Sequence, residues 1–431
     1  MYRMHLSPNV KQKLVGVTVM FAIFVILGSL LVLGRPQDPD FATYEAQTQK
    51  IFEDAKTQFE RIRNVTLPQD IQLYVYTKQQ AVDRWGKTST SSDTTSLLRQ
   101  EAIYKGLFLM DETDSLDGVV AEWIANWNAA ALGNEIYVIY ENFQPWNLPD
   151  AEATLIHELT HIWQKGLPVS SSYDANKAHN ALAEGDASYM SDYYKTHYNT
   201  PPVSGVSVYT EILPDIINVV KLNAVYPSVP ETVTKLNWFP YIQGKAFVSA
   251  LVDDGGWDRI DLCYTPSYLP STTEQILHPD KYLAGESAKI ISAPTLADKS
   301  WTLIPSSYGY DSDNYGEYFI YVMLNRWLNN SQAQQAAAGW GGDTFTYYEK
   351  YSDFLFTWNI IWDSIEDASE FNQAFLDLLD LAQANSQGNN TWFTHGRYLT
   401  LTWDPNTAST LIVCSTNNAV GESSFLYSLP N

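Results

Sequence analysis

The longest apolar run in the chain lies near its amino terminus. Residues 14–34 form a stretch of 21 residues without a charged side chain, long enough for a helix to cross the hydrocarbon core of a bilayer. Basic residues precede this run and acidic residues follow it: Arg3, Lys11 and Lys13, then Asp38, Asp40 and Glu45. Because positive flanks favour the cytoplasmic side, we expect a single-pass signal anchor with the rest of the chain outside the cell. Cleavage after about Ser29 is the alternative.

Apolar residues recur at helical spacing along residues 151–163. Leu155, Ile156, Leu159 and Ile162 form one stripe, which predicts a helix buried along that face. Residues 147–150 supply its start, because Pro149 suits a first helical turn. Directly upstream, residues 135–140 have the composition of a short strand, and residues 71–77 alternate like a second one. The pattern therefore predicts a small sheet that backs a buried helix.

The remaining patterns predict more helices and a hairpin near the end of the chain. Helical segments are expected at residues 41–63 (a stalk), 241–251, 316–327 and 371–382. Residues 398–403 and 410–414, joined by the turn Asp404-Pro405-Asn406, predict a closing hairpin. Residues 341–343, Gly-Gly-Asp, predict a tight turn. The expected fold class is α+β and predominantly helical, plus one N-terminal transmembrane helix.

Residues 157–161 read His-Glu-Leu-Thr-His inside the predicted buried helix. Two histidines four positions apart lie on one face of a helix, where both imidazoles can bind one zinc ion. Glu158 lies between them and can take a proton from a zinc-activated water. The alternative is a helix with two surface histidines. The motif therefore predicts Zn²⁺ as cofactor, His157 and His161 as ligands, and Glu158 as general base.

A catalytic zinc site needs a third protein ligand and one open position for water. Glu184 follows His161 by 23 residues, on a second segment of helical character, and His179 and His197 are other candidates. Leu167 stands where the third histidine of a metzincin would be, which excludes that subtype.

Two histidines followed by a glutamate on a second helix resemble the gluzincin metallopeptidases. The resemblance implies Glu184 as third ligand and a zincin-like, two-lobed fold with a small sheet backing the helix. Asp186 and Asp192 are the nearby carboxylates that could hold the far nitrogen of a ligand histidine.

Peptidases of this kind add a tyrosine or histidine donor that stabilises the oxyanion of the reaction. Tyr241 and His278 are the candidates, although a packed core tyrosine and a structural histidine are equally consistent with the pattern. Segments around both resemble archaeal and bacterial membrane-anchored proteins with predicted zinc-peptidase sites, over roughly residues 135–415. The similar segments occur in the same order: Pro240-Tyr241-x-x-Gly244, then residues 270–279, 337–343 and 362–371.

The charge balance limits the partners. The chain has 26 Lys and Arg against 49 Asp and Glu, a net charge of -23. An acidic surface repels nucleic acid and anionic membrane surfaces, so neither is expected as a binding partner. Cys263 and Cys414 are the only cysteines, which excludes a cysteine zinc site and leaves their pairing open.

These patterns predict a domain plan and a function. The plan has a cytoplasmic segment 1–13, an anchor 14–34, a helical stalk 35–66, a catalytic domain 67–415 with lobes of about 67–170 and 171–415, and a tail 416–431. The expected function is a membrane-anchored extracytoplasmic zinc metallopeptidase that acts on a peptide or protein substrate. One alternative is a cell-envelope structural or binding protein with a non-catalytic metal site, and another is a hydrolase of non-peptide amides.

Overall fold

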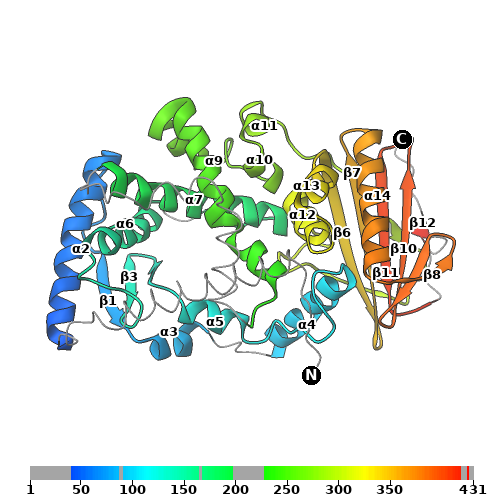
Figure 1. Cartoon of the computed structure of the whole chain (residues 1–431), viewed down its shortest axis with the longest axis horizontal. Coiled ribbons are helices and arrows are strands. Elements are labelled where there is room, and N and C mark those ends of the chain that lie inside the picture. The colour runs from blue at the N-terminus through cyan, green and yellow to red at the C-terminus, as the bar shows by residue number, and fades with distance from the viewer. Residues whose placement is uncertain (1–39, 87–90, 165–166, 198–227, 419–424, 427–431) are drawn as a thin grey trace, which may run out of the picture. The chain divides into compact units, whose positions relative to one another are not determined.

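The computed structural model describes residues 40–86, 91–164, 167–197, 228–418 and 425–426 (Figure 1). The chain divides into two compact units, residues 1–51 and 52–431. Helix α2 (Phe41–Arg63) begins in the first unit and ends in the second, over the residues where the apolar pattern predicts a helix. The candidate site described below lies entirely in the second unit.

A three-stranded sheet lies next to the helix that carries the two histidines. Its strand order is β1-β3-β2, with β1 (Gln72–Tyr76) parallel to β3 (Glu135–Ile139) and β2 (Ala129–Leu132) antiparallel to β3. The chain leaves β3 and enters α6 (Leu148–Gln164), which packs on β2. Leu155, Ile156 and Leu159 of α6 are fully buried, as expected from their helical spacing.

Two long helices, α7 (Tyr173–His197) and α9 (Glu231–Cys263), pack closely on each other. Pro240 lies inside α9 and has no N–H to donate to the carbonyl of Leu236, four residues earlier. The Nζ of Lys177 on α7 donates to this carbonyl at 2.8 Å instead. Burial lowers the pKa of Lys177 to about 8. The carbonyl of Leu236, to which Pro240 cannot donate, therefore forms a hydrogen bond that joins α9 to α7.

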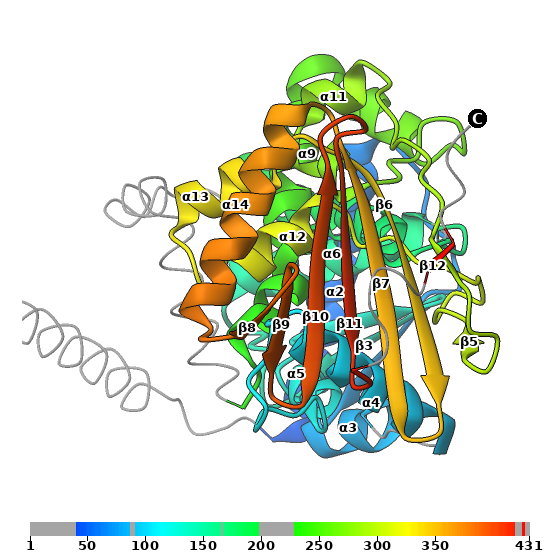
Figure 2. The same cartoon turned by 90° about the vertical axis from the view of Figure 1, so that its right-hand side faces the viewer.

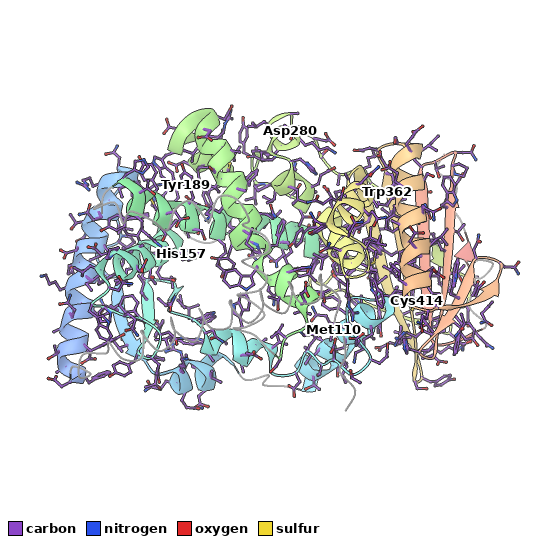
Figure 3. All side chains as sticks on the ribbon, viewed as in Figure 1. Met110, His157, Tyr189, Asp280, Trp362 and Cys414 are labelled. Carbon is purple, nitrogen blue, oxygen red and sulfur yellow. The ribbon has the colours of Figure 1, made fainter. Side chains whose placement is uncertain are left out.

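The largest sheet has seven antiparallel strands in the order β5-β6-β7-β11-β10-β9-β8. Figure 2 shows its long strands, and helices α12 (Gly316–Asn325) and α14 (Ile365–Leu381) pack on one of its faces. Trp358, Trp362 and Phe371 are fully buried in the layer between sheet and helices, where Figure 3 shows the side chains crowded around Trp362. The strands are β5 (Thr302–Ile304), β6 (Trp340–Lys350), β7 (Asp353–Trp362), β8 (Asn385–Gly388), β9 (Thr391–Thr394), β10 (Arg397–Asp404) and β11 (Ser409–Ser415).

Shorter elements complete the second unit. Strand β4 pairs with β12 in a separate two-stranded sheet. Cys263 and Cys414 are both buried free thiols. The elements are α3 (Lys78–Trp85), α4 (Ser91–Gly106), α5 (Val119–Ala125), α10 (Thr273–Leu277), α11 (Pro279–Leu283), α13 (Asn330–Ala337), β4 (Thr295–Leu296) and β12 (Phe425–Leu426).

The predicted fold class was wrong in its transmembrane helix, described below, and it did not include the seven-stranded antiparallel sheet. Strand β6 was missed because residues 340–347 are buried on both faces, which removes the alternation of apolar and polar positions that marks a half-exposed strand. The predicted tight turn at 341–343 is instead the start of β6, where a bulge follows Trp340. A Cβ on Gly342 would lie 2.2 Å from the carbonyl oxygen of Lys289, so the glycine permits close approach of another segment.

The predicted transmembrane helix, residues 14–34, lies outside the residues that the structure describes. Within the described ranges, no helix combines the length and the apolar character needed to cross a bilayer. The expected single-pass localisation and the transmembrane part of the fold class are therefore corrected, and membrane anchoring plays no part in the function proposed below.

Candidate metal centre

Helix α6 brings the two histidines of the motif together. His157 and His161 stand one turn apart, and their Nε2 atoms approach to 3.2 Å. Their rings meet edge to face, with centroids 4.9 Å apart and an interplanar angle of 82°. Two imidazole nitrogens that point at each other from the same helix face leave their lone pairs directed at one shared point. Figure 3 marks His157 on this helix.

Helix α7 contributes Glu184 to the same point. Its Oε2 lies 3.3 Å from Nε2 of His157 and 3.4 Å from Nε2 of His161. For a tetrahedral zinc ion with bonds of about 2.0–2.1 Å, ligand atoms stand about 3.3–3.4 Å apart. The three atoms therefore form one face of a tetrahedron of the size that zinc requires. Oε2 is enclosed and makes no hydrogen bond of regular geometry, so the residues fit the ion.

The other two candidates for the third ligand have different partners. His179 is buried on α7, and its Nδ1 lies 3.0 Å from the hydroxyl of Ser170. His197 is exposed at the end of α7 and stacks on Tyr193 with ring centroids 4.0 Å apart. Neither belongs to the cluster of possible ligands that contains Glu184. Among the described residues, Glu184 is therefore the side chain that completes the set.

The charges of this triad are mutually complementary. Burial opposes protonation of His161, but the charge and hydrogen bonding of Glu184, the charge of Glu158 and the contact with Gln164 together outweigh it and raise the pKa of His161 to about 10. Burial also opposes ionisation of Glu184, but its close contacts with His161 and His157 together hold the pKa of Glu184 far below its usual range. The cluster thus favours a positive charge at its centre, which a divalent cation supplies.

Glu158 lies beside this triad in a drier environment. It is 6% exposed, and burial raises the pKa of its carboxyl group against the lowering influence of His157 and His161. The backbone of Ala131 on β2 also lowers the pKa of this carboxyl group, by less than burial raises it. A general base works best when its pKa is near the working pH, so a raised carboxyl pKa suits proton transfer.

A buried network sets the orientation of His161. Nδ1 of His161 lies 3.0 Å from Oε1 of Gln164, whose Nε2 donates to the carbonyl of Ala183 at 2.9 Å and approaches Oδ2 of Asp186 at 3.4 Å. Because the amide nitrogen faces two acceptors, the amide oxygen must face His161. Nδ1 of His161 then carries the proton, and its Nε2 keeps the lone pair for a metal.

Asp186 is in turn held by a buried cation. Nη1 of Arg63 donates to Asp186 at 2.9 Å, and both side chains are fully enclosed. Tyr264 donates its hydroxyl to the same carboxylate at 3.0 Å. Arg63 also lies between the rings of Trp163 and Trp257, 4.2 and 4.3 Å from their centroids. Asp186 therefore acts on the histidine through another residue rather than by direct contact.

Sequence reasoning found only part of this network. The other predicted carboxylate, Asp192, pairs instead with Lys245 at 2.8 Å on the surface. Gln164 was missed, although it follows His161 by three positions on the same helix face and could have been found by that spacing. Arg63 gives no such signal, because it precedes Asp186 by 123 positions in the sequence.

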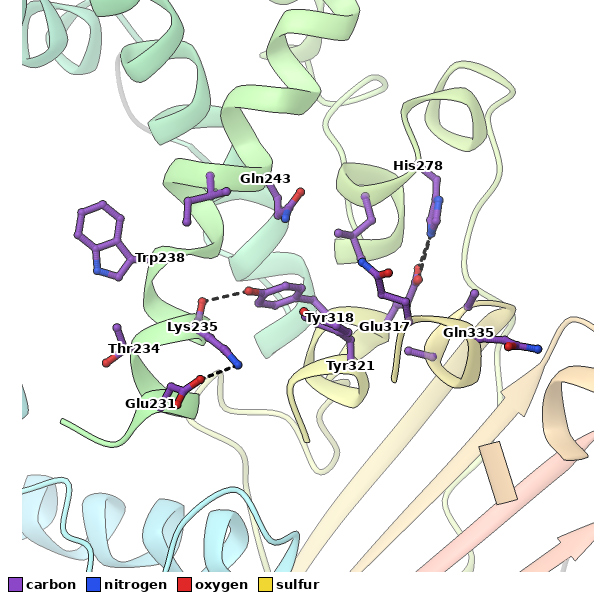
Figure 4. A pocket seen from close by; sticks show the side chains of 15 residues that line it. Glu231, Thr234, Lys235, Trp238, Gln243, His278, Glu317, Tyr318, Tyr321 and Gln335 are labelled. Atoms are coloured by element: carbon purple, nitrogen blue, oxygen red, sulfur yellow. Dashed lines mark hydrogen bonds and ion pairs between the residues drawn. The ribbon is translucent and has the colours of Figure 1, made fainter. Parts of the chain in front are cut away.

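The two predicted oxyanion donors lie in different places. Tyr241 on α9 stacks nearly parallel to His157, with ring centroids 6.5 Å apart and an angle of 10°. His278 instead bonds through Nε2 to both carboxylate oxygens of Glu317 at 3.0 Å. This pair lines a cavity of about 500 Å³ whose lining contains none of the three possible metal ligands (Figure 4). Tyr241 therefore lies beside a candidate metal ligand, and His278 does not.

Two glycines set the distance between the helices that carry Glu184 and Tyr241. A Cβ on Gly185 would lie 2.3 Å from the backbone of Gly244, and a Cβ on Gly244 would lie 2.1 Å from the carbonyl of Ala181. Real side chains cannot approach this closely, so α7 and α9 touch through their backbones only because both positions are glycine. This backbone contact holds α7, which carries Glu184, directly against α9, which carries Tyr241.

A second acidic cluster already contains its cation. Glu274, Glu286 and Asp363 could hold a metal by their spacing. The Nζ of Lys281 lies 2.6, 3.1 and 3.2 Å from these carboxylates. The positive charge of Lys281 thus offsets the negative charge of these carboxylates, and the cluster is a structural ion-pair network.

Comparisons with known proteins give few clues. A domain of unknown function, DUF8575, matches residues 305–420, a segment that does not include the triad. A search of curated protein sequences finds no match. A solved structure described as "a putative hydrolase with a novel fold from Chloroflexus aurantiacus" aligns with a TM-score of 0.37 and 14% identity, covering 57% of this chain and 91% of the other. Similarity at this level establishes neither a shared fold nor a shared activity, so the chemistry must be argued from the site.

Proposed function

We propose that this protein is a zinc-dependent hydrolase that cleaves peptide bonds. His157, His161 and Glu184 would hold the ion, and Glu158 would act as general base. The observation that carries the proposal is the triangle of ligand atoms, with sides of 3.2, 3.3 and 3.4 Å. It is the combination of this triangle with a buried carboxylate beside it that favours catalysis over a purely structural site.

The chain supplies three ligands and leaves the fourth position to a small molecule. Among the described residues, the cluster of possible ligands contains these three side chains alone. A structural zinc site is closed by four protein ligands, whereas a catalytic site keeps one position for water or substrate. The zinc, when bound, would supply Lewis acidity that polarises a carbonyl group and lowers the pKa of water.

The residues of the chain then have separate tasks. Glu158 accepts the proton of the attacking water and passes it to the nitrogen of the leaving amine, so that the proton count balances. Gln164 keeps His161 in the tautomer that presents Nε2. Tyr241, stacked on His157, is the candidate that would donate its phenol to the oxyanion. His278 has no part in this scheme, because it pairs with Glu317 in another cavity.

The test measures zinc content and peptide cleavage on the full chain and on three variants. Glu158→Gln should keep one bound zinc and lose cleavage, because the amide cannot accept the proton. Glu184→Ala should lose zinc and cleavage together. Glu45→Gln, an exposed glutamate on α2, is the matched control and should change neither.

Each other outcome counts against the proposal. Zinc bound without cleavage of any peptide in the unmutated protein would favour a binding or structural role. Cleavage that persists in Glu158→Gln would remove that residue from the mechanism. Zinc content that is unchanged in Glu184→Ala would show that the metal binds elsewhere.

A further inference from the structure

Helix α9 forms one wall of the 500 Å³ cavity that His278 also lines. Trp238 and Ile242 of α9, Tyr318 and Tyr321 of α12, and Leu277 at the end of α10 are among its lining residues. Figure 4 labels Trp238, Tyr318 and Tyr321. The other side chains include residues of α13 and of the first turn of α9. A cavity of about 150 Å³ is already large enough to hold a benzene ring, so this one has room for any amino-acid side chain.

The charged groups around the cavity are already paired within the chain. Lys235 pairs with Glu231 at 2.8 Å, and His278 pairs with Glu317 at 3.0 Å. A charged ligand group would have to compete with these pairs. The rest of the lining is mainly indole, phenol and aliphatic carbon, together with the amides of Gln243, Gln334 and Gln335. Its apolar part gains most by covering another apolar side chain.

A row of aromatic rings joins the cavity to the candidate metal centre. The ring of Trp238 lies 5.1 Å from that of Tyr241, and the ring of Tyr241 lies 6.5 Å from that of His157. The two spans together equal the length of about three residues of extended peptide, at ~3.4 Å per residue. A substrate bound at His157 can therefore place a side chain near Trp238.

We propose that this cavity is the subsite for a large apolar side chain of the substrate, aromatic or branched aliphatic, two to four residues from the cleaved bond. The proposal rests on the function proposed above, since it assumes a peptide bound at the candidate metal centre. Trp238 connects the two places, because it packs on Tyr241 near the candidate metal centre and also lines the cavity.

The first experiment measures which side chains the enzyme prefers. Peptides with Phe, Leu, Ala, Asp or Arg at each of four positions on either side of the cleaved bond are compared. At one position, two to four residues from that bond, Phe and Leu should be cleaved about tenfold to a hundredfold faster than Ala, from the burial of one side chain. Ile242→Trp, which fills the cavity, should abolish this preference.

Ala338→Trp, just after the end of α13, fills the cavity from another side and is the second variant in case Ile242→Trp does not fold. Leu376→Trp on α14 adds the same ring at a position that is 38% exposed and should leave the preference unchanged. A preference that survives both cavity-filling substitutions overturns the proposal. So does a preference for Asp or Arg over Phe at that position.

A binding experiment separates this inference from the proposed function. Equilibrium affinities of Phe-containing and Ala-containing peptides are measured on zinc-loaded Glu158→Gln, with and without Ile242→Trp. Tighter binding of the Phe peptide that disappears with Ile242→Trp supports the subsite, even if the unmutated protein cleaves nothing. Equal affinities for both peptides overturn it, even if the protein is an active peptidase.

Discussion

Gln164 offers the sharpest test of how the chain prepares its candidate metal centre. The side chain is buried and joins His161, Ala183 and Asp186 through one amide group. Replacing it by alanine removes the acceptor at Nδ1 of His161, and the ring can then adopt either tautomer or turn away. Zinc affinity should fall even though no metal ligand has been changed.

The magnitude follows from the contacts that are lost. Removal of the group that orients a ligand histidine typically lowers metal affinity about 10–100-fold. The same change removes the 2.9 Å hydrogen bond from Gln164 to the carbonyl of Ala183, and one such hydrogen bond contributes about 0.5–1.5 kcal/mol to the folding free energy. Gln164→Ala should therefore weaken zinc binding and lower the stability of the metal-free protein as well.

A conservative variant separates the two effects. In Gln164→Glu a carboxylate can still accept from His161 but cannot donate to Ala183 or Asp186. We expect zinc affinity near that of the unmutated protein together with reduced stability. Competitive zinc titration against a chelator measures the first quantity, and urea unfolding of the metal-free protein measures the second.

Gln387→Ala, an exposed glutamine on β8, is the matched control for both measurements. If zinc affinity in Gln164→Ala stays within about twofold of the unmutated protein, Gln164 does not orient His161 for the metal and the prediction is refuted. Loss of zinc binding in Gln164→Glu as severe as in Gln164→Ala would also refute it, since the acceptor is retained.

Three further predictions concern the frame around the site. Gly244→Ala should unfold at a lower urea concentration, by about 1–3 kcal/mol for overpacking, since its Cβ would lie 2.1 Å from the carbonyl of Ala181. Arg63→Met should cost about 3–5 kcal/mol in the same assay, because a fully buried carboxylate loses its cation. The hydrogen bond that His278 donates to Glu317 raises the pKa of His278 above 6.5. The stability that this pair contributes is therefore complete below about pH 6.5 and is lost as the pH rises through the folded-state value. Urea midpoints measured from pH 5 to pH 9 should show this slope in the unmutated protein and a flatter profile in His278→Gln.

Local patterns predicted local structure well. The apolar stripe of residues 151–163 lies within α6, the strands expected at 71–77 and 135–140 correspond to β1 and β3, and the closing hairpin is formed by β10 and β11. Each of these depends on spacing within one element, where sequence neighbours are also spatial neighbours. Strand β6 was missed because residues 340–347 are buried on both faces, which hides a strand from periodicity, and that burial comes from segments elsewhere in the chain.

The same distinction between local patterns and contacts of distant segments applies to the residues of the candidate site. His157, Glu158 and His161 could be predicted because a helix places positions four apart on one face. Glu184 could be proposed only by resemblance, and the structure is what places its Oε2 3.3 Å from His157. The metal itself and the activity stay predictions until the zinc and cleavage measurements are made.

By itself, the sequence determined the helix that presents two histidines and a carboxylate, since that arrangement needs one turn of backbone and nothing more. Only the tertiary structure decided that Gln164 orients His161, that Arg63 reaches across the fold to Asp186, and that the cavity beside Trp238 lies three residues' length from the site. The reason is physical. These contacts join residues far apart in the chain, and their formation depends on how α6, α7 and α9 pack, which the side chains of all three helices settle together.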